Sequence, residues 1–133
     1  MSQHSSLSPE RWARFSHPQR ILMIANEMNR ARRMMGAERT AGRRLAYERV
    51  LRMADLTIAV ADRRPVRREL LRWRDLVAEL YLAEEGRPER HRAALQALLE
   101  QTPLSALQVE ALGCQARVRR ASGSGETEGR TPQ

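Results

Sequence analysis

The segment AYERVLRMADLTIAVADRRPVRRELLRWRDL, residues 46–76, decides the fold. From Ala46 to Ala61, apolar residues recur at intervals of three and four and cover about half of a helical circumference, which is typical of a well-buried helix. Pro65 cannot continue that helix, but it is well tolerated in the first turn of a new one. The segment therefore predicts two long antiparallel helices that turn near Pro65.

Prolines and glycines predict where the other helices begin and end. The pairs Ser8-Pro9 and Thr102-Pro103 each place a capping hydroxyl before a proline, as at many helix starts. Glycines at positions 36, 86 and 113 fall where helices should end. No stretch alternates polar and apolar residues as a strand does. We predict helices over residues 9–15, 18–35, 40–62, 65–85, 88–101 and 103–112.

These elements predict an all-α protein, a compact antiparallel bundle of four main helices with short flanking helices. The 133 residues suit one domain with a modest core. We expect a flexible N-terminus over residues 1–7, a single helical domain over 8–113, and a polar, disordered tail over 114–133. The tail is rich in Gly, Ser and charge, a composition that buries too little apolar surface to fold.

The helix predicted over 65–85 has two apolar faces. Its broader face, which we assign to the core, consists of Val66, Leu70, Trp73, Leu76, Val77 and Leu80. A narrower stripe of Leu71, Ala78 and Leu82 lies almost opposite. An apolar stripe left over from the core faces either another helix of the chain, here residues 88–101, or another molecule. Leu71, Ala78 and Leu82 are therefore candidate interface residues.

Arginine dominates the charge of the chain. All 24 basic residues are arginine, against 16 acidic residues, which gives a net charge of +8. The excess suits an anionic partner such as nucleic acid, although the codon bias of a GC-rich genome also raises arginine content. Arginines in the first turn of a helix oppose its dipole unless an anion compensates them. The candidate anion-binding or nucleic-acid-binding residues are Arg43, Arg44, Arg63, Arg64, Arg67 and Arg68.

A short internal echo predicts a charged cluster. VLRMADL, residues 50–56, and LLRWRDL, residues 70–76, share four identities at an offset of 20. In a helical hairpin these segments lie side by side, so their charged side chains can pair. We interpret the cluster, which consists of Arg52, Asp55, Arg72 and Asp75, as structural.

The sequence contains no catalytic constellation. The histidines at positions 4, 17 and 91 lack metal-ligand spacing, and Cys114 is the single cysteine, so we predict no catalytic residue, metal site or cofactor. A degenerate ribonuclease-like activity that uses His17 or His91 is the minor alternative. One cysteine, no signal pattern and no apolar run of about 18 residues favour a soluble protein of the cytoplasm, away from membranes.

Together these features favour a non-enzymatic interaction module. It would self-associate or dock on a protein partner through the stripe of Leu71, Ala78 and Leu82, because arginine beside apolar residues is common at interfaces. The alternative is a protein that contacts the phosphate backbone of a nucleic acid without base specificity. With five aromatic residues in the chain, base stacking has little support, but contacts to phosphate need only arginine.

Overall fold

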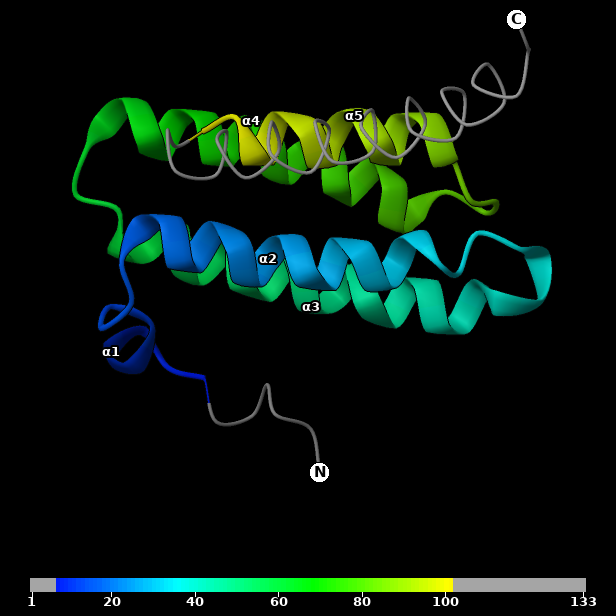
Figure 1. Ribbon diagram of the computed structural model, residues 1–133, viewed down its shortest axis with the longest axis horizontal. Helices are drawn as coiled ribbons and strands as arrows, with labels where there is room; N and C mark the ends of the chain where they lie inside the picture. The colour runs from blue at the N-terminus through cyan, green and yellow to red at the C-terminus, as the bar shows by residue number, and fades with distance from the viewer. Residues whose placement is uncertain (1–6, 102–133) are drawn as a thin grey trace, which may run out of the picture.

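The computed structural model describes residues 7–101, and every regular element within them is a helix (Figure 1). The predicted all-α class is therefore confirmed. The helix predicted over 103–112, the tail over 114–133 and residues 1–6 of the N-terminus lie outside the described residues. In chain order the elements are α1 (Pro9–Trp12), α2 (His17–Arg32), the 3-10 turn η2 (Ala37–Arg39), α3 (Thr40–Val60), α4 (Arg64–Leu82) and α5 (Pro88–Leu99).

The helices begin where the prolines predict. Four prolines, at positions 9, 18, 65 and 88, lie in the first turn of α1, α2, α4 and α5. The α2 start is also closed by a capping box, because the Ser16 hydroxyl accepts from the Gln19 amide at 3.2 Å and Gln19 Oε1 accepts from the Ser16 amide at 2.8 Å. These local contacts fix the helix starts to within about one residue of the prediction.

All four main helices end two or three residues earlier than predicted, at Arg32, Val60, Leu82 and Leu99. The glycines that follow do not act as left-handed caps, because no glycine among residues 7–101 has a positive φ. At Gly86 the constraint is space. A Cβ atom there would lie 2.6 Å from the carbonyl oxygen of Met35. Gly86 therefore lets the α4–α5 turn lie against the backbone that follows α2.

The four long helices share one core. α2 packs on α3, α3 on α4, α4 on α5, and α5 again on α2, while α1 lies against α3 (Figure 1). This arrangement encloses one apolar cluster that draws residues from every helix except η2. Its large, almost fully buried members include Trp12, Ile21, Ile24, Met28, Tyr47, Val50, Leu70, Val77 and Leu98.

Two buried tryptophans hold helices together through their indole N–H groups. Trp12 Nε1 donates to Thr57 Oγ1 at 2.8 Å and so fixes α1 on α3. Trp73 Nε1 donates to the Ala94 carbonyl at 2.7 Å and fixes α4 on α5. Because each ring is almost fully buried with its polar atom bonded, both residues contribute apolar contact without an unsatisfied donor.

One predicted core residue, Leu76, is 47% exposed. It faces α5 where that helix carries Ala93 and Ala94, and all three residues line the same groove. The two alanines are too short to cover a leucine. The prediction was wrong because the helical period assigns a direction to Leu76 but says nothing about the size of the side chains opposite.

The predicted charged cluster of Arg52, Asp55, Arg72 and Asp75 does not form. Asp55 pairs across the α3–α4 contact with Arg74, a residue that the sequence echo left out. Arg72 pairs with Glu69 on its own helix at 3.2 Å, and Arg52 donates to the Leu7 carbonyl. Positions 72 and 74 lie about 200° apart around α4, so only Arg74 points toward α3.

Candidate interaction surfaces

The outward face of α4 carries the predicted stripe. Leu71 is 46% exposed and Leu82 is 72% exposed, and Ala78 between them is partly exposed. Of the five large apolar side chains that are exposed among residues 7–101, three belong to α4: Leu71, Leu76 and Leu82. The predicted alternative, in which α5 covers the stripe, does not hold for the two leucines.

The neighbours of α4 explain why this face stays open. Its core residues, among them Leu70 and Val77, point into the protein. α3 lies along one flank, where the Tyr81 hydroxyl donates to Glu48 at 3.3 Å, and α5 lies along the other, where Trp73 bonds to Ala94. The stripe lies on the side that neither neighbour reaches.

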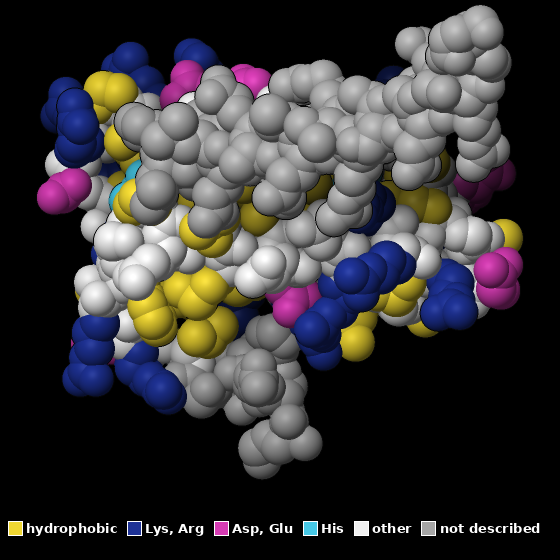
Figure 2. Space-filling view, in the orientation of Figure 1, with side chains coloured by type: hydrophobic (Ala, Val, Ile, Leu, Met, Phe, Trp, Pro, Cys, Tyr) yellow, Lys and Arg dark blue, Asp and Glu magenta, His cyan; other side chains and the backbone are white. Residues whose placement is uncertain are grey.

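The start of α4 forms a basic corner, the surface that bears Arg63, Arg64, Arg67 and Arg68. The side chains of Arg63, Arg64 and Arg68 are exposed and have no hydrogen-bond or ion-pair partner among residues 7–101. No side chain caps the α4 N-terminus. Figure 2 shows arginine side chains around the end of the molecule where α4 begins. Free amides and unpaired guanidinium groups together favour an anion there.

Arg67 differs from the other arginines of the basic corner. Its guanidinium donates to the Ala61 carbonyl at 2.7 Å, just beyond the end of α3. This bond satisfies a carbonyl that the helix leaves free and places positive charge at the negative end of the α3 dipole. The side chain of Arg67 thus takes part in the turn between α3 and α4.

Arg43 is not a surface residue, which corrects its assignment as an anion-binding candidate. It is 1% exposed, and its two terminal nitrogens donate to the carbonyls of Met34 and Glu84, each at 3.2 Å. These carbonyls follow the ends of α2 and α4, so Arg43 joins two helix ends from inside. Arg44, the next residue, remains partly exposed.

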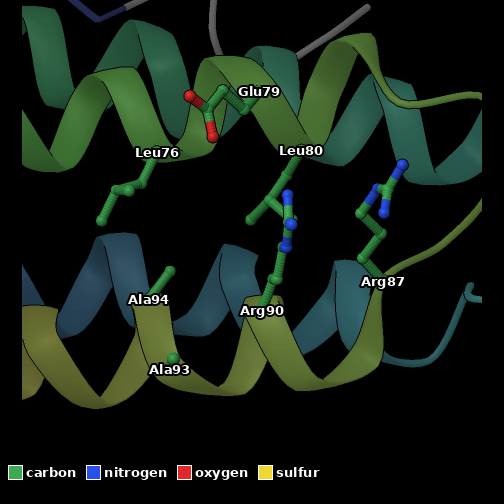
Figure 3. Close-up of a pocket in the computed structure, with 7 residues that line it drawn as sticks. All are labelled: Leu76, Glu79, Leu80, Arg87, Arg90, Ala93 and Ala94. Atoms are coloured by element: carbon green, nitrogen blue, oxygen red, sulfur yellow. The ribbon is translucent and has the colours of Figure 1, made fainter.

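A groove of about 430 Å³ lies between α4 and α5 (Figure 3). Leu76 and Leu80 of α4 point toward Ala93 and Ala94 of α5, which leaves an apolar floor. Its charged lining residues are Glu79, Arg87 and Arg90. The sequence did not predict this groove, since it depends on two alanines opposite two leucines across a contact between helices.

Of the two histidines considered for catalysis, His91 is buried and His17 is partly buried. His91 is fully buried, and its Nδ1 lies 2.8 Å from the Tyr47 hydroxyl, while its Nε2 makes no well-formed hydrogen bond. Burial lowers the pKa of His91 and raises the pKa of Tyr47 to about 12. Burial also lowers the pKa of His17, which lies at the start of α2. The His91–Tyr47 pair thus serves as a neutral polar contact inside the core.

Within residues 7–101, no group of three or more His, Cys, Asp or Glu side chains is arranged to hold a metal ion. In the same range, no α-helix combines the length and the run of apolar residues that a membrane span requires.

Comparison of the chain with known proteins identifies no relative. No protein-family model matches the chain, and neither the curated proteins nor the solved structures contain a match.

Proposed function

We propose that this chain is a small non-enzymatic interaction module that docks on another protein molecule through the outward face of α4. The observation that carries the proposal is the exposure of Leu71 and Leu82, 46% and 72%, on the side of α4 away from the core. Exposed apolar side chains that gather on one face are typical of contact surfaces, whereas scattered ones need no explanation.

We further propose that α2–α5 act as a rigid antiparallel bundle that presents this face. The closed order of helix contacts and the Trp73–Ala94 bond support a fixed position for α4. A helix held along its whole length loses little conformational freedom on binding, so more of the contact energy remains as affinity.

The charges beside the stripe support the same assignment. Arg68 and Arg72 lie on exposed positions next to Leu71, and arginine is enriched at protein interfaces because it joins apolar contact to directed donors. A cytoplasmic location is part of the proposal, since the single cysteine in the chain suits a reducing compartment.

The proposal is tested by photo-crosslinking in living cells. We expect Leu82→benzoylphenylalanine and Leu71→benzoylphenylalanine to give a discrete adduct with a protein. The control, Ala59→benzoylphenylalanine, lies on the exposed side of α3 and should give none. Equal labelling at all three positions, or no adduct at 71 and 82, would show that the α4 face is not a contact surface.

A second function is favoured by the basic corner. Arg63, Arg64 and Arg68 have no partner among residues 7–101 and surround an uncapped helix start. We propose, as the alternative, contact with the phosphate backbone of a nucleic acid at this corner. The flanking carboxylates of Asp62 and Glu69 weaken the local field, so several phosphates are needed for useful affinity.

Fluorescence anisotropy with a labelled RNA or DNA duplex tests this alternative. Binding should weaken steeply between about 50 and 200 mM salt, as expected when arginines displace counterions. The triple variant Arg63→Glu, Arg64→Glu and Arg68→Glu should abolish binding. The matched variant Arg87→Glu, Arg90→Glu and Arg92→Glu, at the other end of the molecule, should retain most of it. Equal losses in both variants would leave only nonspecific attraction to a basic protein.

A further inference from the structure

We infer that the partner of the α4 face is a second copy of this chain, bound so that the two α4 helices run antiparallel about a two-fold axis. The inference rests on the proposed function and adds the identity and the orientation of the partner. It is carried by the spacing of the exposed residues of α4 and by the order of their charges.

The exposed residues of α4 have the spacing of a helix-pairing seam. Along the outward face the intervals are three, four, three and four residues, the repeat with which two helices pack side chains into each other's gaps. The core residues of α4 occupy the opposite side, so no residue of the seam belongs to the described core. The seam consists of Arg68, Leu71, Asp75, Ala78 and Leu82.

The exposed charges on the seam and at its border change sign at the middle of α4. Arg64, Arg68 and Arg72 precede this point, while Asp75 and Glu79 follow it, and all five side chains are exposed. A parallel pair of helices would place like charges together. An antiparallel pair places the basic half of each helix against the acidic half of the other, which sets the orientation.

One register satisfies both the apolar and the charged residues. If Leu71 lies opposite Leu82 of the second copy, Asp75 lies opposite Ala78, whose small side chain leaves space for the carboxylate and for water. In the same register Arg72 borders the seam next to Glu79 of the second copy. The two-fold axis makes each contact occur twice.

The charged residues at the border of the seam are free to pair in this way. Among residues 7–101 Arg72 pairs only with Glu69, and the two side chains are 75% and 60% exposed. Such a surface pair has little energy to lose when Arg72 turns toward a new carboxylate. Glu79 is exposed and has no ion-pair partner among residues 7–101.

The small area of the seam limits the expected affinity of the dimer. The 19 residues of α4 span about 28 Å, and one helix face per molecule buries less area than a standard interface. We therefore expect a reversible dimer with a dissociation constant on the order of 100 μM. A dimer of this strength is seen only at raised protein concentration.

A charge exchange between two variants tests the inference by sedimentation equilibrium, from about 10 μM to about 1 mM, a range that spans the expected constant. The wild-type chain should dimerise. Arg72→Glu and Glu79→Arg should each remain monomeric, because each places like charges together at both border contacts. An equimolar mixture of the two should dimerise again, since every border contact then joins opposite charges. Far-UV circular dichroism checks that both variants keep their helices.

Two controls complete the experiment. Arg92→Glu removes one exposed arginine from α5 and should leave the dimer unchanged, while Leu82→Arg should abolish it. A monomeric wild type, or a mixture that stays monomeric, overturns the inference. In that case the crosslinks at positions 71 and 82 test the proposed function separately. An adduct with a different protein would support the α4 face as a contact surface and would show that its partner is not a second copy.

Discussion

At the scale of single residues, Arg43 shows how a charge can be buried without a carboxylate. Its guanidinium donates to two carbonyls that follow helix ends, at Met34 and Glu84. Peptide dipoles concentrate negative charge at such ends, so they replace part of the solvation that burial removes. The sequence placed Arg43 at the start of a helix, where an arginine is unfavourable. It did not show that the carbonyls of Met34 and Glu84 would bind the guanidinium inside the protein.

A second buried polar residue, His91, makes stability depend on pH. Burial lowers its pKa below the ordinary value of 6.5, and the positive charge of Arg32 acts in the same direction. As the pH falls through about 6.5, the unfolded chain takes up a proton before the folded chain does, so folding becomes less favourable. Above that pH His91 is neutral in both states and contributes no slope.

We therefore predict that the melting temperature of the wild-type chain falls between pH 7.5 and pH 5.5. His91→Gln keeps a polar group near Tyr47 but cannot titrate, so it should have a lower melting temperature and a flatter pH profile. His17→Gln serves as the comparison, since burial lowers the pKa of His17 as well. Thermal unfolding followed by circular dichroism measures both slopes. An unchanged slope in His91→Gln would show that His91 does not titrate on unfolding.

At the scale of elements, the turns depend on close approach of the backbone. Gly36 and Gly86 both have ordinary negative φ values, but they differ in what a side chain would meet. A Cβ at Gly86 would lie 2.6 Å from the Met35 carbonyl oxygen and 2.9 Å from its Cα, which are backbone atoms. The atoms nearest to a Cβ at Gly36 would be those of the Glu38 side chain, which can rotate away.

We predict that Gly86→Ala lowers the free energy of unfolding by about 1–3 kcal/mol, because the α4–α5 turn must move away from Met35. Gly36→Ala should be neutral or stabilising by up to about 1 kcal/mol, since alanine restricts the unfolded chain and fits the turn. Urea denaturation of the two variants measures the difference. Similar values for both would show that the turn at Gly86 relaxes without cost.

The helices themselves were largely predictable from the sequence, and the contacts between them were not. Ser16 caps a helix start through a hydrogen bond to a residue three positions on, and Pro65 restricts its own backbone to a conformation that suits the first turn. Both effects are local, so they can be predicted from the sequence. The ion pair of Asp55 with Arg74, the burial of Arg43 and the exposure of Leu76 depend on which helices meet and at what angle. The candidate stripe on α4 was predictable because helical period alone separates Leu71 and Leu82 from the core.

At the scale of the whole molecule, surface and stability are linked through association. If folded chains pair through α4 and unfolded chains do not, dimerisation draws the equilibrium toward the folded state. The apolar contacts of Leu71 and Leu82 would then stabilise the fold although neither residue belongs to the core. The net charge of +8 opposes the approach of two copies, while the basic and acidic halves of α4, paired with those of the second copy, offset this repulsion locally.

We predict that the melting temperature of the wild-type chain rises with protein concentration. At a total concentration about ten times the dissociation constant, about one fifth of the folded chains remain monomeric, so pairing adds about 1 kcal/mol, which corresponds to several degrees for a domain of this size. Calorimetry from about 10 μM to about 1 mM should show this rise, given a constant on the order of 100 μM. Leu82→Arg, at a position 72% exposed, should melt at one temperature throughout and match the wild-type chain at the lowest concentration. A wild-type melting temperature independent of concentration would show that the α4 face does not join two copies.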